Sequence, residues 1–255
     1  MAWPGPPESS PSPLRTGWSL LWEHRWRWLA LTHIGLVVVL AMYFMMVFAN
    51  TAEFAYSFWN EPPPTDAADR FAVLSLLALA AAVVLVGYVI YGAYCVMFLD
   101  ARRGGTTSTF VVLRRTVRPA LRAWWWGPLL FVAAAVSVLL VFPAFFAVPA
   151  LAPLPFSVIL ATKPSIGHRA LVRSTYQRLM PVSIITAVAG FAVAQSYVGS
   201  VVLVERFDGI VEVLVLPISW VCYLILALTA ALAAACIAVL VGDDPAGINR
   251  APIET

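Results

Sequence analysis

Few side chains in this 255-residue sequence have the type and spacing that would support catalysis or metal binding. The sequence has no phosphate-cradling glycine loop, no HExxH zinc motif, no CxxC pair and no GxSxG turn. His24 and His168 fall in amphipathic segments, where we expect solvated or headgroup-facing imidazoles rather than bases. His33 lies just inside an apolar run without an acidic partner, so we expect a neutral, hydrogen-bonded side chain. The sequence therefore predicts no catalytic residue, no metal site and no cofactor.

The three cysteines and the acidic pair Asp243–Asp244 are the other candidates for metal or redox chemistry. Cys95, Cys222 and Cys236 each lie inside an apolar run and have no paired spacing, as is typical of small buried side chains. The acidic pair directly follows an apolar run, so a polar stop accounts for it. Pairs of small residues four apart, such as Ala231–Ala235, indicate close packing between helices instead.

The composition indicates a membrane protein. Hydrophobic residues make up 62% of the chain and charged residues 11%, whereas a soluble domain holds about 45–50% and about 25% respectively. A soluble core built from this chain would lack the polar surface needed to cover it, so lipid is the expected solvent. The formal net charge of +3 gives no indication of a nucleic-acid partner.

Uncharged apolar runs account for most of the chain, and a membrane helix needs about 20 such residues. The runs are Trp28–Phe48, Phe71–Leu99, Trp124–Ala161, Pro181–Leu203 and Val213–Val241. Prolines interrupt the third run, which would form either two short spans or a re-entrant hairpin packed against protein. With two spans there, the sequence predicts an all-α transmembrane bundle of about six spans in three hairpins.

The positive charges are sorted between the loops. Of the sixteen Lys and Arg residues, only Arg70 and Arg206 fall in the loops that follow the first, third and fifth spans. Those loops carry acidic residues instead: Glu53, Glu61, Asp66, Asp69, Glu205, Asp208 and Glu212. Positive-inside bias therefore places both termini and the arginine-rich loops in the cytoplasm.

The same sorting defines the domain organisation. We expect a Pro/Ser-rich cytoplasmic tail at 1–13, a membrane domain at 14–241 and a short cytoplasmic tail at 242–255. Abundant alanine and the preference for arginine over lysine indicate a GC-rich bacterial genome, and hence the bacterial plasma membrane.

An amphipathic segment precedes each hairpin, at Leu14–Trp28, Thr107–Trp124 and Ser165–Met180. Apolar stripes flanked by arginine and tryptophan are typical of a helix in the headgroup plane; the alternative is that these are the cytoplasmic ends of long tilted helices. The residues predicted to meet lipid headgroups are Arg25, Arg27, Arg114, Arg115, Arg118, Arg122, Arg169, Arg173, Arg178, Trp22, Trp26, Trp124 and Trp125.

Helical spacing predicts which residues of these segments share a face. In the first segment the predicted ridge comprises Leu14, Trp18, Trp22 and Trp26, with Glu23 and Arg27 as an i,i+4 pair. In the second segment the predicted stripe comprises Phe110, Leu113, Val117, Leu121 and Trp124. Thr107 or Ser108 is expected to cap the second helix, and Pro119 to kink it or to begin the next helix. A short pattern, a leucine followed three residues later by a small residue, recurs at Leu14–Gly17, Leu113–Thr116 and Leu171–Ser174.

One stretch carries a family resemblance. Residues 156–176, FSVILATKPSIGHRALVRSTY, end an apolar run and pass through a turn into an amphipathic helix before a new span. With Ala170, Leu171, Arg173 and Ser174, this stretch resembles the helical membrane domain of some bacterial glycerophosphodiester phosphodiesterases and its six-span stand-alone relatives. Because only residues 242–255 follow the last span, we expect no phosphodiesterase barrel and no such activity.

Two functions fit these observations. The first is a non-enzymatic scaffold or accessory component of a membrane complex, which holds anionic lipid headgroups through the arginine-bearing segments. The alternative is a permease subunit whose cytoplasmic segments dock an ATPase, or a passive transporter of an apolar substrate. No span carries the buried carboxylates of a proton-coupled transporter, or the acid, base and nucleophile of an enzyme.

Overall fold

The computed structural model describes residues 12–60, 65–122, 132–133, 149–153, 176–193, 195–196 and 210–242. In these residues the chain is helical and contains no strand, as the sequence predicts. Among the described residues, four helices are long and apolar enough to cross a membrane, with candidate spans at Arg25–Met45, Leu77–Arg102, Tyr176–Val193 and Pro217–Val241. The predicted middle pair of spans falls almost entirely outside the described residues.

The first amphipathic segment is two helices rather than one. Helix α1 (Pro13–Glu23) begins where the Ser12 side chain accepts a hydrogen bond from the Arg15 N–H, at 3.3 Å, with proline in the first turn. A turn at His24 separates it from α2 (Arg25–Asn60), and the His24 carbonyl accepts from the N–H groups of Arg27 and Trp28. The prediction of one segment over Leu14–Trp28 is therefore wrong, because a helix boundary falls at residue 24.

Helices α2 and α3 (Thr65–Arg102) are longer than the predicted spans they contain. At 1.5 Å per residue, their 36 and 38 residues extend roughly 54 and 57 Å, more than the roughly 40–45 Å of a bilayer with its headgroups. Glu53, Asp66 and Asp69, predicted to lie in a loop, therefore lie within these two helices instead. Helix α9 (Ile210–Gly242) covers the predicted last span and accommodates Pro217.

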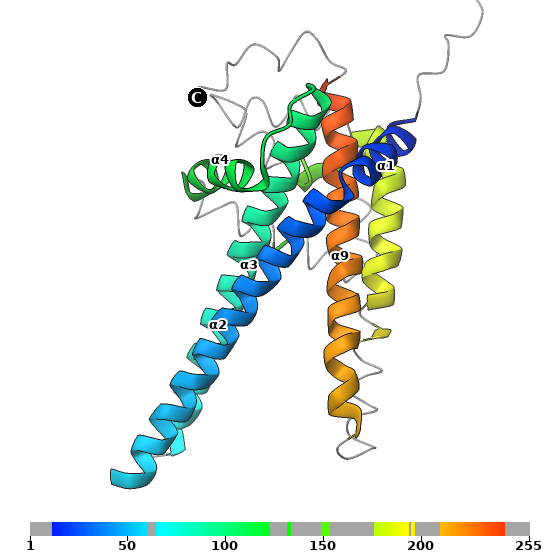
Figure 1. Ribbon diagram of the computed structural model, residues 1–255. Coiled ribbons are helices and arrows are strands. Elements are labelled where there is room, and N and C mark those ends of the chain that lie inside the picture. The colour runs from blue at the N-terminus through cyan, green and yellow to red at the C-terminus, as the bar shows by residue number, and fades with distance from the viewer. Residues whose placement is uncertain are drawn as a thin grey trace, which may run out of the picture.

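The helix ends that carry most of the described arginines lie together, away from the acidic end of α2 (Figure 1). Helix α1, the C-terminal ends of α3 and α9, the start of helix Tyr176–Val193 and the short helix α4 (Thr109–Arg122) lie together at one end. The acidic end of α2 and the start of α9 lie at the other. The C-terminal end of α3 and the start of helix Tyr176–Val193 lie at the same end of the described bundle.

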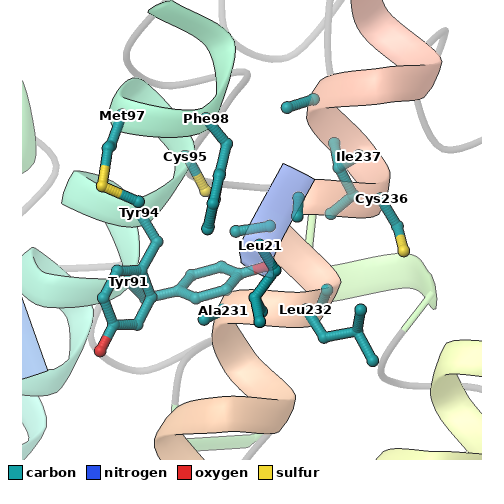
Figure 2. Close-up of a cluster of buried hydrophobic side chains, with 14 of the residues drawn as sticks. Leu21, Tyr91, Tyr94, Cys95, Met97, Phe98, Ala231, Leu232, Cys236 and Ile237 are labelled. Carbon is teal, nitrogen blue, oxygen red and sulfur yellow. The ribbon is translucent and has the colours of Figure 1, made fainter. Parts of the chain in front are cut away.

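The core lies where α1 and α3 pack against α9 near the basic end. Figure 2 shows Leu21 of α1 between the aromatic residues of α3, such as Tyr91, and Ala231 and Leu232 of α9. Residues 231–241 of α9 are all buried, so the small-residue spacing at Ala231–Ala235 lies within a packed helix face as predicted. Leu179 and Val182 of helix Tyr176–Val193 join the same cluster. Cys95 and Cys236 are buried thiols of this core, whereas Cys222 is half-buried.

A close helix crossing and hydrogen bonds from side-chain hydroxyl groups hold the helices of the core together. A Cβ atom added to Gly17 of α1 would lie 2.6 Å from the Cys236 Sγ, so glycine allows α1 to cross α9 closely. The Thr32 hydroxyl of α2 donates to the Trp28 carbonyl at 2.7 Å, so the Tyr94 hydroxyl of α3, at 2.6 Å, donates to Thr32. The Tyr223 hydroxyl of α9 donates to the Thr32 carbonyl at 3.1 Å. Thr32 therefore connects three helices.

Candidate lipid-headgroup interface

Helix α4 is held at the end of α3 by a turn built on Asp100. The Asp100 carboxylate accepts a hydrogen bond from the Thr107 N–H at 3.2 Å, and the Asp100 backbone carbonyl accepts one from the Gly105 N–H at 2.9 Å. Gly104 has a φ of +77°, which glycine adopts without strain. The Ser108 hydroxyl, 3.5 Å from the Val111 nitrogen, then caps the helix as predicted.

The face of α4 that packs on the bundle is not the predicted stripe. Its buried residues are Val112, Thr116 and Ala120, four residues apart on one face. Leu113 and Val117 are half-buried beside that face, whereas Phe110 is 74% exposed. Pro119 is half-buried and lies inside the helix, so it does not begin a new one. The part of the predicted stripe whose side chains are described is thus a flank of α4 that adjoins the buried face.

Three arginines cover the outer face of α4. The side chains of Arg114, Arg115 and Arg118 are all exposed, on the side opposite the buried face. Arg122 ends the helix, but its side chain is not among those described. The arrangement leaves an apolar flank beside a cationic face, which suits a helix at the boundary between acyl chains and headgroups.

Helix α1 likewise has one face buried against the bundle and one exposed face. Gly17 and Leu21 are buried and Leu14 packs beside them, whereas the predicted ridge is wrong in including Trp26, which lies in α2 beyond the turn at His24. Trp18 and Trp22 are exposed and stack on each other, with ring centroids 6.4 Å apart and an interplanar angle of 10°. The aromatic rings therefore flank the docked face instead of forming it.

The guanidinium group of Arg25 contacts two tryptophan rings. The Arg25 guanidinium carbon is 5.7 Å from the ring centroids of both Trp22 and Trp26, and an Arg25 nitrogen donates to the Trp22 carbonyl at 3.4 Å. Each such cation–π contact contributes about 0.5–1 kcal/mol at an exposed site. Tryptophan and arginine together are the pair that anchors helices at a membrane surface.

The structure explains the first two copies of the leucine-and-small pattern, in which a small residue follows a leucine three positions later. Gly17 of α1 and Thr116 of α4 are both fully buried against the bundle, and Leu14 and Leu113 pack at the edge of the core. A small side chain at this position lets each amphipathic helix approach a span closely. The third copy, Leu171–Ser174, lies outside the described residues.

Two donors at the start of α2 have no acceptor. In the described chain, Arg27 Nη2 and Trp28 Nε1 are withdrawn from solvent and have no hydrogen-bond partner. The predicted Glu23–Arg27 pair is wrong for these described residues, because the turn at His24 interrupts the helix between them. An unsatisfied buried donor costs about 1–3 kcal/mol, and more when it is charged.

No protein-family model, curated protein or solved structure matches this chain. The relationship to the phosphodiesterase membrane domains therefore stays a prediction. Residues 156–175, which carry nearly all of that resemblance, lie outside the described residues.

The remaining predicted residues divide between described and undescribed parts of the chain. Arg178 is exposed in the first turn of helix Tyr176–Val193, at the same end as α1 and α4. Arg169, Arg173, Trp124 and Trp125 lie outside the described residues. His33 is hydrogen-bonded as predicted, with its Nδ1 2.7 Å from the Leu29 carbonyl oxygen and its ring edge-on to Trp220. Among the described residues, no three His, Cys, Asp or Glu side chains are grouped as metal ligands.

Proposed function

We propose that this chain is a non-enzymatic, multi-pass protein of the bacterial plasma membrane that holds anionic lipid headgroups at its basic end. In this role it acts as a lipid-contacting scaffold or as an accessory component of a membrane complex. The observation that supports the proposal most directly is the exposed arginine face of α4, formed by Arg114, Arg115 and Arg118, at the end of four apolar helices.

The exposed apolar side chains of the helices support the membrane setting. Val37 and Phe44 of α2, Val188 of helix Tyr176–Val193 and Val221 of α9 are all exposed in the described bundle. Such side chains need lipid around them, because a soluble protein rarely exposes contiguous apolar faces of this extent. The arginines lie beyond the ends of these faces, where headgroups would meet them.

Electrostatics sets the expected strength and side of the interaction. Each arginine near an anionic leaflet contributes about 1 kcal/mol, and the effect falls off within a Debye length. The positive-inside rule assigns the basic end, with both termini, to the cytoplasm. The three exposed arginines of α4 would together contribute about 3 kcal/mol, or a roughly 100-fold preference for anionic over neutral lipid.

The test is to replace Arg114, Arg115 and Arg118 together with glutamine. Lipid partitioning is measured by titrating detergent-purified protein with phosphatidylglycerol and with phosphatidylcholine, counting bound lipids by mass spectrometry of the intact protein. The triple glutamine variant should lose most of its salt-sensitive preference for phosphatidylglycerol. The matched triple lysine variant keeps the charge and should retain most of the preference. Equal lipid binding by the glutamine and lysine variants, both folded by circular dichroism, would refute the proposal.

A further inference from the structure

We propose that His33 of α2 and Trp220 of α9 form a binding site for an uncharged lipid that carries a free hydroxyl group, with diacylglycerol as the model ligand. The lipid O–H donates a hydrogen bond to His33 Nε2, and the Trp220 ring forms one wall of the site. This inference goes beyond the proposed function, because its ligand has no charge and both residues lie inside candidate spans rather than on the arginine face.

The hydrogen bond at His33 Nδ1 determines which ring nitrogen is available to a ligand. His33 Nδ1 lies 2.7 Å from the Leu29 carbonyl oxygen. A carbonyl oxygen only accepts, so Nδ1 carries the hydrogen, and Nε2 of the neutral imidazole is then an acceptor with a free lone pair. The described residues provide no donor for Nε2, and the His33 side chain is exposed. A donor from outside the chain can therefore reach Nε2.

Packing between α2 and α9 holds the His33 ring in place. The ring centroids of His33 and Trp220 are 6.4 Å apart, with an interplanar angle of 62°, and Trp220 is 46% exposed. On the packed side of α2, the neighbouring Thr32 carbonyl accepts a hydrogen bond from the Tyr223 hydroxyl at 3.1 Å. A Cβ atom added to Gly35 would lie 3.3 Å from the same Tyr223 oxygen, so the Tyr223 side chain of α9 lies close against α2 here. Because the tautomer and the ring orientation are set before a ligand arrives, less entropy is lost on binding.

The surroundings of His33 are apolar, so the surroundings themselves do not satisfy Nε2. Val37, one turn further along the same face of α2, is 63% exposed, and Val221, next to Trp220, is 48% exposed. In a membrane these side chains face acyl chains, which have no hydrogen-bond donor. An ionisable side chain inside a span is a candidate functional site for this reason. The ligand that suits Nε2 is therefore a lipid that brings its own donor.

The depth of His33 favours an uncharged donor over a phosphate headgroup. Arg25, whose guanidinium contacts the rings of Trp22 and Trp26, marks the headgroup level. His33 follows Arg25 by eight residues, roughly 12 Å further along α2. A phosphate drawn to this level would leave water, which costs far more free energy for a charged group than for a hydroxyl. The hydroxyl of a diacylglycerol is uncharged and lies on the glycerol backbone, below the level of phospholipid phosphate.

The experiment uses two amide side chains that imitate different nitrogens of histidine. His33→Asn keeps a donor near Nδ1 but has no acceptor at Nε2, whereas His33→Gln can place its carbonyl oxygen near Nε2. Delipidated wild type and both variants, shown to be folded by circular dichroism, are titrated with dioleoylglycerol. The matched ligand is dioleoylglycerol with its hydroxyl capped as an acetate ester. Bound ligand is counted by mass spectrometry at about 1 M salt, where a Debye length of about 3 Å suppresses electrostatic binding at the surface.

Wild type should bind dioleoylglycerol about 3- to 10-fold more tightly than the capped ligand, the difference that one hydrogen bond makes. His33→Gln should keep this preference for the free hydroxyl, and His33→Asn should lose it. Trp220→Ala should weaken the binding of both ligands, because both would contact the same wall.

Three results would overturn the inference. One is equal binding of the free and the capped ligand by wild type. The second is the same preference in His33→Asn and His33→Gln, and the third is unchanged binding of both ligands by Trp220→Ala. The α4 glutamine variant should bind dioleoylglycerol as wild type does, because that ligand has no charge. The result for that variant with phosphatidylglycerol therefore bears on the proposed function and not on this site.

Discussion

The contact between Gly17 and Cys236 gives the sharpest prediction about how α1 is docked. A Cβ at residue 17 would lie 2.6 Å from the Cys236 Sγ and 3.1 Å from the Cys236 backbone nitrogen and Cα. The sulfur can move by rotation, but the α9 backbone cannot, so a leucine at residue 17 must push the two helices apart. Overpacking of this kind costs about 1–3 kcal/mol. Leucine also gains about 0.8 kcal/mol of helix propensity over glycine, so the net loss expected for Gly17→Leu is about 0–2 kcal/mol.

Thiol reactivity reports the displacement more directly than stability does. Cys236 is fully buried under α1, whereas Cys222 is half-buried, so the assay uses Cys222→Ser as background. In Gly17→Leu, a maleimide should label Cys236 faster, by up to about 30-fold, the change that about 2 kcal/mol of opening produces. Ser19→Leu is the matched control, because it adds a leucine to the exposed side of α1. Equal labelling of the Gly17→Leu and Ser19→Leu proteins would refute the helix crossing.

The remaining predictions concern two local features. Thr32→Val leaves the buried Tyr94 hydroxyl without its acceptor, so the free energy of unfolding in detergent should fall by about 1–3 kcal/mol. Adding Tyr94→Phe should recover part of this loss. If the effects of the two substitutions on the free energy of unfolding were strictly additive, the hydrogen bond would be refuted. Gly104→Ala forces alanine to a φ of +77° and should destabilise the turn before α4 by about 1–2 kcal/mol, visible as faster proteolysis there; unchanged cleavage would count against that turn geometry.

The helical class and the positions of the described spans follow from the sequence because hydrocarbon tolerates few other solutions. Runs without charge must be helical in lipid, so the described parts of the first two and the last two predicted runs lie in helices. The same reasoning placed the basic segments at one end of the bundle. It could not locate the break at His24, because no proline or glycine marks that position in the sequence.

The docked faces of the amphipathic helices were harder to predict for a physical reason. Hydrophobicity ranks Phe110 and Trp22 above Thr116 and Gly17, yet the two larger side chains are exposed and the two smaller residues are buried. In a membrane setting the large apolar residues already have an apolar environment in lipid, so burial against protein adds little. Small residues decide instead which face can approach another helix closely. The leucine-and-small pattern therefore indicated which face of each helix docks on the bundle, whereas the large apolar side chains did not.

The docking of α1 and α4 on the bundle determines where the arginines of the basic end lie. If α1 and α4 floated in the headgroup layer, their arginines would sample many positions, and lipid binding would be weak and non-specific. Because Gly17 and Thr116 fix the two helices against the bundle, Arg25 and the α4 arginines hold constant positions relative to the spans. Rigid placement lowers the entropy lost when a headgroup binds. Loosening α1 by Gly17→Leu should therefore weaken the preference for anionic lipid proposed for the basic end, although the substitution removes no arginine. A normal preference for phosphatidylglycerol in that variant, with Cys236 labelled rapidly, would separate the docking of α1 from lipid binding.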